Sequence, residues 1–260
     1  MRRGCGLQRF FRSDHYQHLG ETAPTTGPTD AWISLAGLAR ETSRIRIGTL
    51  VTCATFRYPG HLAITVANVD QMSGGRVEIG IGAGWHEAEH TSYGIPYPGV
   101  GERFDRLAEQ LEILTGLWTA EETYSFDGKH YTLKDSPALA KPVQSPHPPL
   151  IVGGRGKRRT PELAAKFADE YNLPFGTPED AVEQYRRVAE VCGDIGRDPK
   201  SLRYSVVLPA CVGPDDATLR RRAAATGFEL AVLRQIGVAG TSGEVVDVLG
   251  RWREAGAQRI

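Results

Sequence analysis

Alternating hydrophobic and polar positions predict two β-strands with a helix between them in the segment 43–85. Residues 44–51 and 76–81 alternate and are rich in β-branched side chains, so both are predicted to be strands. Between them, apolar side chains recur at helical spacing over residues 58–72, and Ser73-Gly74-Gly75 ends that helix. A helix that joins two strands in this way implies parallel pairing, which is typical of βαβ enzyme scaffolds.

The same patterns predict further elements along the chain. Strands are expected at residues 7–12, 150–153, 170–173 and 203–208, with a short strand at 258–260. Helices are expected at residues 30–42, 101–118, 161–168, 177–192, 215–235 and 241–255. Asp127-Gly128 indicates a hairpin between residues 124–126 and 130–133.

The length and the element order together favour one α/β domain. A barrel of eight parallel strands and eight helices takes about 250 residues, and this chain has 260. We therefore expect a single domain over residues 1–260, a TIM-like (β/α)8 barrel with an excursion at residues 85–149. The first strand with its helix and the last strand with its helix are missing from the pattern, so the barrel is expected to be incomplete.

Charge and composition exclude several classes of partner. Thirty-one basic and thirty-one acidic side chains cancel, so no global field attracts nucleic acid or an anionic membrane. Met1-Arg-Arg is not followed by an apolar segment, and no stretch approaches the roughly 18 apolar residues of a membrane span. Four cysteines without CxxC spacing indicate reduced, mostly buried thiols. These features predict a soluble cytoplasmic protein.

Two glycine-rich segments follow predicted strands. Gly80-Ile-Gly-Ala-Gly84-Trp85 is not a dinucleotide fingerprint, because Trp85 stands where the third glycine is needed. Its small residues either let a planar ligand approach the backbone or make a tight turn. Residues 151–159 do not match a Walker A loop. They form either a phosphate site, with cations at Arg155, Lys157, Arg158 and Arg159 before a helix, or a solvated basic face.

Two histidine motifs carry candidate chemistry. Residues 86–90, His-Glu-Ala-Glu-His, match the zinc-protease pattern HExxH. Gly84 before the motif and Tyr93-Gly94-Ile95-Pro96 after it leave room for a helix of only about two turns, so we favour two surface or pocket-rim histidines and expect no metal. Asp14-His15 follows the first predicted strand, where barrel enzymes concentrate catalytic residues. Such a histidine can accept a proton near neutral pH, but an isolated Asp-His pair is more often structural, so both interpretations stay open for these two residues alone.

Taken in order, these motifs resemble the luciferase-like monooxygenase family, especially its branch that uses the deazaflavin coenzyme F420. The similarity covers nearly the whole chain. It rests on residues 13–15, 42–49, 73–76, 80–85, 102–104 (Glu-Arg-Phe), 141–144 (Lys-Pro-Val-Gln), 146–149 (Pro-His-Pro-Pro) and 151–154 (Ile-Val-Gly-Gly).

The resemblance implies a barrel that holds F420, or FMN as the alternative, across the C-terminal ends of the strands. It implies a non-proline cis peptide, which by position falls at Leu50–Val51. It also implies that His15 acts on the substrate's proton during hydride transfer and that Asp14 contributes orientation and cofactor contacts. The cofactor-binding residues it implies are Leu50, Val51, Cys53, Gly82, Gly84, Trp85, Gly153, Gly154, Arg155 and Gly156.

The function expected on this basis is an oxidoreductase that transfers a hydride between F420 and a small organic substrate. The basic residues after Gly154 suit the polyglutamate tail of F420, which FMN lacks. Trp85 stands where some deazaflavin dehydrogenases carry a glutamate. The aromatic rim (Phe56, Tyr58, Trp85, Tyr93 and Tyr97) suits an apolar or conjugated substrate, or is core packing.

Three alternatives stay open from the sequence. The first is an FMN-dependent flavin monooxygenase of the same family. The second is a truncated, non-catalytic remnant, because the barrel lacks elements at both ends. The third is a zinc hydrolase built on His86 and His90. A homodimer is left open as the assembly.

Overall fold

A computed structural model of the chain describes residues 7–17 and 27–260, and contacts divide these into two compact units. The first unit holds residues 7–17 and 27–151, and the second holds residues 152–260. Each unit is described by itself below. Cys5 lies outside the described residues, whereas the other three cysteines are buried and free, as predicted.

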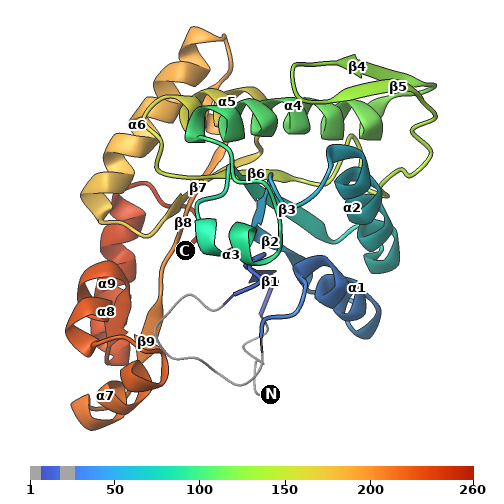
Figure 1. Ribbon diagram of the computed structural model, residues 1–260. Helices are drawn as coiled ribbons and strands as arrows, with labels where there is room; N and C mark the ends of the chain where they lie inside the picture. The colour runs from blue at the N-terminus through green and yellow to red at the C-terminus, as the bar shows by residue number, and fades with distance from the viewer. Residues whose placement is uncertain (1–6, 18–26) are drawn as a thin grey trace. The chain divides into compact units, whose positions relative to one another are not determined.

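The first unit is built on three parallel strands with helices between them (Figure 1). Its elements are β1 (Arg9–Arg12), α1 (Ala31–Glu41), β2 (Arg46–Cys53), α2 (Pro59–Ser73), β3 (Val77–Gly82), α3 (Glu87–Ser92), α4 (Val100–Thr119), β4 (Tyr124–Asp127) and β5 (Thr132–Ser136). Strand β2 pairs with β1 through Phe10 and Ile47 and with β3 through Ile47 and Val77, in parallel on both sides. The predicted βαβ unit is therefore confirmed.

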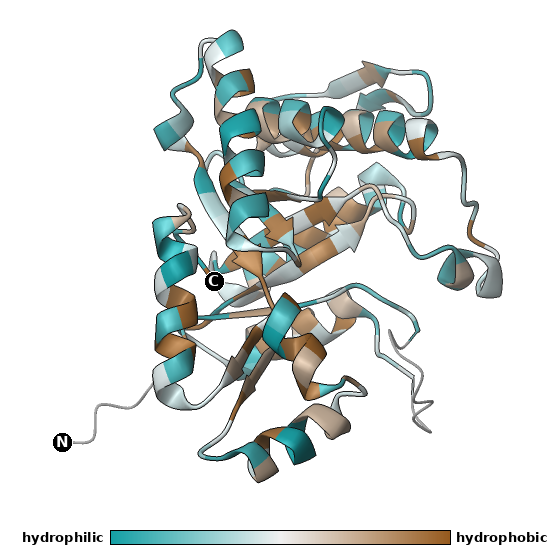
Figure 2. Cartoon of the chain, turned by 90° about the vertical axis from the view of Figure 1, so that its left-hand side faces the viewer, coloured by the Kyte–Doolittle hydropathy of each residue, from teal (hydrophilic) through white to brown (hydrophobic). Residues whose placement is uncertain are grey.

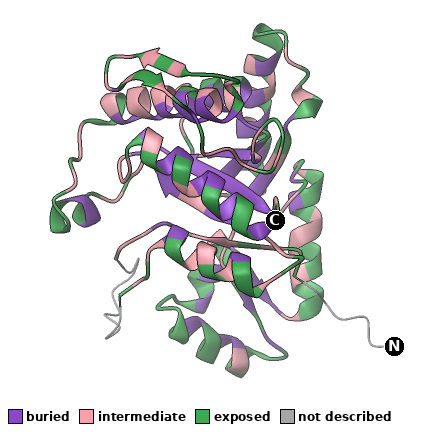
Figure 3. Ribbon diagram, turned by 90° about the vertical axis from the view of Figure 1, so that its right-hand side faces the viewer, coloured by how far each residue is buried: buried purple, intermediate pink, exposed green. Residues whose placement is uncertain are grey.

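Burial explains why these segments form strands and helices. Every residue of β3 is buried, because helices and neighbouring strands cover it, and Figure 3 shows central strands in the purple of buried residues, whereas the hairpin of β4 and β5 is green and pink. In α4, Leu107, Leu111, Leu114 and Leu117 are buried at helical spacing. Figure 2 shows the same pattern as alternating brown and teal along the helices. The predicted hairpin is confirmed as the antiparallel pair of β4 and β5.

Strand β6 (Leu150–Gly153) lies across the border between the two units. Just before the strand, the backbone N–H of Ile79 donates a hydrogen bond to the carbonyl of Pro149, within the first unit. At its end, the N–H of Gly154 donates to the carbonyl of Asn172, within the second unit. Each of these two hydrogen bonds therefore lies within a single unit.

The second unit repeats the strand–helix order. It contains α5 (Arg159–Phe167), β7 (Glu170–Pro174), α6 (Pro178–Asp194), the 3₁₀-helix η1 (Pro199–Ser201), β8 (Arg203–Val207) and α9 (Ser242–Glu254). Strands β7 and β8 pair in parallel, and Arg259 forms a parallel bridge to Ser205, where a short final strand was predicted. Helices α6 and α9 both start with a capping box, on Thr177 and Thr241.

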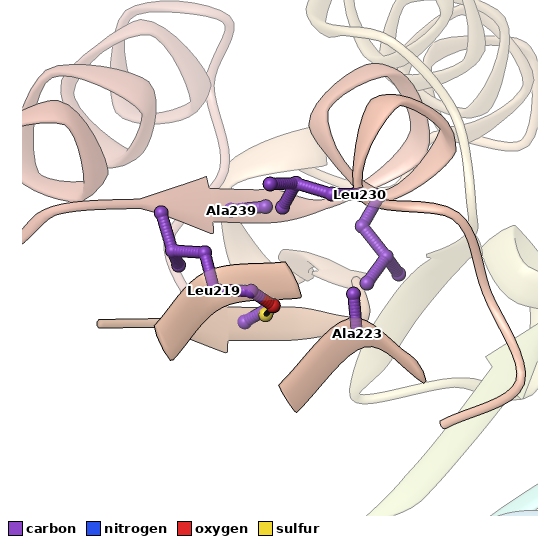
Figure 4. Close-up of a cluster of buried hydrophobic side chains, with 6 residues drawn as sticks. Leu219, Ala223, Leu230 and Ala239 are labelled. Atoms are coloured by element: carbon purple, nitrogen blue, oxygen red, sulfur yellow. Dashed lines mark hydrogen bonds between the residues drawn. The ribbon is translucent and has the colours of Figure 1, made fainter. Parts of the chain in front are cut away.

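One part of the second unit differs from the prediction. The helix predicted over residues 215–235 is wrong as one element, because α7 (Asp216–Ala225) and α8 (Leu230–Ile236) are separated around Gly227, whose φ is +76°. Two short parallel strands, β9 (Ala210–Val212) and β10 (Val238–Gly240), were not predicted. Figure 4 shows Leu219, Ala223, Leu230 and Ala239 from these elements packed as a small core, with Cys211 and Leu233 in the same cluster.

The predicted fold class is confirmed. Parallel strands alternate with helices, and the described residues supply six strands of this repeating kind: β1, β2, β3, β6, β7 and β8. A closed barrel needs eight, so the TIM-like barrel is incomplete over the described residues. The single domain with an excursion at residues 85–149 stays a prediction. None of the helices in the described segments is both long and apolar enough to span a membrane.

Candidate active site

Asp14 lies at the C-terminal end of β1 and is bonded to β2 by its side chain. It is 1% exposed and accepts a 3.0 Å hydrogen bond from the hydroxyl of Thr52, which in turn accepts one of 2.9 Å from the indole N–H of Trp32. Thr52 and Trp32 therefore fix one carboxylate oxygen in place. Sequence reasoning found Asp14 but neither of these partners.

Arg57 supplies the counter-charge for this buried carboxylate. Its guanidinium pairs with both oxygens of Asp14, and Nη2 lies 2.5 Å from Oδ2 of Asp30 and 3.1 Å from the hydroxyl of Tyr16. Burial raises the pKa of Asp14 more than the cation lowers it, and burial raises the pKa of Tyr16 to about 12. The result is a closed cluster in which every charge has a partner.

His15 is held by a carboxylate that the sequence did not reveal. Its Nδ1 lies 2.6 Å from Oε1 of Glu89, and the Glu89 side chain is fully buried. The second oxygen of Glu89 accepts the backbone N–H groups of Tyr16 at 2.5 Å and Gln17 at 3.3 Å. The ring of Trp85 meets that of His15 edge to face at 5.7 Å. The imidazole is thus oriented through one nitrogen.

The backbone of β2 changes course next to this cluster. The Leu50–Val51 peptide is cis, as the resemblance implied, and the pairing of β2 with β3 shifts between Thr49 and Thr52. At Gly84, φ is +81°, and an added Cβ would lie 2.4 Å from the sulfur of Cys53. A side chain at this position would therefore collide with β2, which accounts for glycine there.

His90 belongs to a buried framework, which corrects its expected place at the surface or pocket rim. It is 1% exposed; Nδ1 lies 2.8 Å from the carbonyl of His86, and Nε2 lies 2.6 Å from the hydroxyl of Thr55. Both ring nitrogens are therefore engaged by protein oxygens rather than free for a metal. No group of three or more candidate ligands gathers in the described residues. Burial raises the pKa of Cys53 beside it to about 11.

The five predicted rim aromatics divide into two kinds. Tyr97 stacks over Arg103 and bonds the carbonyl of Trp85, and Phe56 lies between Tyr16 and His90, so both serve as packing. Trp85, Tyr58 and Tyr93 are exposed. Trp85, which is 64% exposed, stacks on His86 at 5.0 Å. Of these three, it is the one in ring contact with His15.

The predicted phosphate loop lies in the second unit. Gly154 has a φ of +150°, and its carbonyl accepts a 2.8 Å bond from the hydroxyl of Tyr171. The Arg155 guanidinium forms an ion pair with Asp180 at 3.0 Å and donates to the carbonyl of Phe175. Asp180 therefore neutralises part of its positive charge. Arg158 pairs with Glu162. Gly153 and Gly156 are half-buried, and Lys157 is exposed before α5.

A cavity of about 660 Å³ lies elsewhere in the first unit. It is lined by Leu7 to Arg9 and Thr42 to Arg46, at the N-terminal ends of β1 and β2. Ligands of parallel-strand folds bind at the opposite, C-terminal ends, where Asp14 and His15 lie. Hence we do not assign this cavity to the active site.

The chain is similar in sequence to enzymes that use a deazaflavin or a flavin. An F420-dependent glucose-6-phosphate dehydrogenase of Microbacterium testaceum is 36% identical over 66% of this chain and 49% of its own length. An FMNH(2)-dependent dimethylsulfone monooxygenase of Pseudomonas putida is 34% identical over 44% of this chain and 31% of its own length. The chain spans about half the length of the curated relatives it matches.

The fold is also found among solved structures. An F420-dependent secondary alcohol dehydrogenase, in complex with an F420-acetone adduct, superposes with a TM-score of 0.82. It is 22% identical and covers 98% of this chain and 83% of its own. The model of the family described as luciferase-like monooxygenase matches residues 5–228. The chain therefore belongs to the luciferase-like monooxygenase family.

Proposed function

We propose that this chain is an F420-dependent oxidoreductase that transfers a hydride between the deazaflavin and a small organic substrate. The observation that carries the proposal is His15, which follows β1 and is held through Nδ1 by the buried carboxylate of Glu89. The deazaflavin-dependent relatives support the choice of cofactor. Their substrates differ from one another, so the substrate here is proposed only as a small organic molecule.

The first unit offers residues that suit a planar ring. Leu50 and Val51 are half-buried within β2 at its register shift, and Gly82 ends β3 opposite Cys53 without a side chain, followed by Gly84. Together with Trp85, these residues would hold the ring. The deazaflavin, when bound, supplies the carbon that accepts or gives up the hydride.

His15 would move the substrate's proton. With Nδ1 committed to Glu89, Nε2 is the nitrogen that can accept a proton from a substrate hydroxyl or return it. Asp14 has both oxygens bonded to protein, so we propose that it orients the turn that carries His15 rather than contacting the cofactor.

The loop of the second unit, taken by itself, is proposed to bind an anionic group such as a phosphate. Gly153, Gly154 and Gly156 leave the backbone accessible before the N-terminus of α5, where a phosphate is favoured. Arg155 and Lys157 add positive charge, although Asp180 offsets that of Arg155. The basic residues of this loop suit the acidic tail of F420, which FMN lacks, and so support the choice of F420.

Turnover tests the proposal directly. The protein would be mixed anaerobically with oxidised F420 and, in separate samples, secondary alcohols and sugar phosphates, and the visible absorbance of the oxidised deazaflavin would be followed. We expect substrate-dependent bleaching that depends on His15. Bleaching that is absent with F420, together with substrate-dependent oxygen consumption with reduced FMN, would favour the monooxygenase alternative, which the relative from Pseudomonas putida supports.

A further inference from the structure

We propose that Glu89 is a positioning residue that locks His15 in the tautomer whose Nε2 can accept a proton. This inference deepens the proposed function and rests on His15 being its acid–base group. The first observation is the burial of Glu89. Glu89 is fully buried, yet its carboxylate lies 2.6 Å from a histidine nitrogen. A buried carboxylate requires hydrogen-bond donors, and within the described residues Glu89 has three, from residues 15–17.

The two oxygens of Glu89 have separate tasks. Oε2 accepts the backbone N–H groups of Tyr16 and Gln17, which can only donate. Oε1 faces Nδ1 of His15. Because a carboxylate can only accept, Nδ1 must carry the hydrogen of this bond, and the neutral ring then has an unprotonated Nε2. The same interaction fixes the direction in which Nε2 points.

The backbone contacts make the effect of an amide at position 89 predictable. In Glu89→Gln, the amide oxygen must face the N–H groups of Tyr16 and Gln17, because an NH₂ group there would oppose two donors. The NH₂ group must then face His15, so Nδ1 becomes the acceptor and the hydrogen moves to Nε2. The substitution keeps the size of the side chain but reverses the tautomer.

The expected kinetic consequence is a loss of rate rather than of binding. In the Ser-His-Asp triad, the equivalent change of carboxylate to amide costs about 10⁴ in kcat through the wrong tautomer. General acid–base catalysis contributes about 10²–10⁴. We therefore expect Glu89→Gln to lower kcat by about 10²–10⁴, with substrate KM and deazaflavin affinity much less affected, and Glu89→Asp to recover part of the loss.

A matched control lies on the same helix. Glu87 is two residues earlier in α3 and exposed, so Glu87→Gln makes the same chemical change without touching His15. Its kcat should equal that of the unchanged protein. A loss of kcat in Glu87→Gln as large as that in Glu89→Gln would contradict the inference.

The deciding experiment is ¹⁵N NMR of histidine-labelled protein above the ordinary histidine pKa of about 6.5. The His15 signals are assigned by their loss in His15→Gln. We expect the Nδ1–H tautomer in the unchanged protein and in Glu87→Gln, and the Nε2–H tautomer in Glu89→Gln. An Nε2–H tautomer in the unchanged protein would overturn the inference, even if Glu89→Gln does not fold. A failure to bind or reduce F420 would instead refute the proposed function, because the tautomer is measured without cofactor.

Discussion

The end of β1 and the loop after β6 are both predicted binding regions, but they are built differently. Around Asp14 and His15, carboxylates are buried and every charged group has a fixed partner. Around Arg155, the cations are half-exposed or exposed, and their ion pairs lie in solvent. Buried, bonded groups hold a proton donor or acceptor in one geometry, whereas exposed cations attract an anion without fixing it. Changes in the first region should therefore alter rate, and changes in the second should alter affinity.

The largest effect is expected at His15. His15→Asn removes the group that takes the substrate proton, so kcat should fall by about 10²–10⁴ while deazaflavin affinity changes little. Steady-state kinetics and a binding titration measure both. His61→Asn, at an exposed position of α2, serves as the control. A His15 variant that loses affinity but keeps kcat would reverse the roles assigned to the two regions.

Replacing Arg57 should destabilise the region around Asp14 and His15. In Arg57→Met, Asp14 and Asp30 lose their shared counter-charge, which for a buried pair costs about 3–5 kcal/mol of unfolding free energy. Urea denaturation measures the loss. Arg186→Met removes two exposed ion pairs of α6, with Glu183 and Glu190, and should change stability little. Equal losses in the two variants would contradict the difference between buried and exposed pairs.

The loss in Arg57→Met should depend on pH. The pKa of Asp14 is already above its ordinary 3.8 in the folded state, and removal of Arg57 raises it further. The folded state then binds the proton more tightly than the unfolded state, so stability falls as pH rises through the folded pKa. The deficit should therefore be smaller at about pH 5 than at about pH 8. A loss of unfolding free energy in Arg57→Met that grows as the pH falls would contradict this prediction.

Gly84 and Gly94 allow steric overlap to be separated from backbone strain. Both have positive φ, but an added Cβ at Gly84 meets the sulfur of Cys53 at 2.4 Å, whereas nothing lies within 4 Å at Gly94. Gly84→Ala should therefore cost about 1–3 kcal/mol more than Gly94→Ala in thermal or urea unfolding. Adding Cys53→Ala to Gly84→Ala should recover part of that difference. Equal costs for the two single variants would exclude the overlap.

The smallest effects are expected in the loop of the second unit. Lys157→Ala should weaken F420 binding and Asp180→Asn, which releases Arg155, should strengthen it, each by about two- to five-fold. Both effects should shrink at high salt, because the groups are exposed. Binding titrations at two salt concentrations test this. Changes in F420 affinity that do not depend on salt would contradict this prediction. A large change in kcat would contradict it as well.

The sequence predicted what depends on local patterns. Periodicity and turn chemistry predicted the strands and helices. Motifs singled out Gly84 and placed Asp14 and His15 at the end of a strand. Glu89 could not be found in this way, because it stands inside an HExxH pattern that directs attention to Glu87, and its partner His15 is 74 residues away. Arg57 gave no signal either, because its two carboxylates lie in separate segments. The break at Gly227 was overlooked within an otherwise helical pattern.

The most direct measurement is a fluorescence titration of purified protein with F420 and, separately, with FMN. If the ends of these strands form a site for the deazaflavin, F420 fluorescence should be quenched with saturation on the order of tens of micromolar or below, and excess FMN should not displace it. Saturable binding of FMN, with no binding of F420 over the same range, would contradict the proposal.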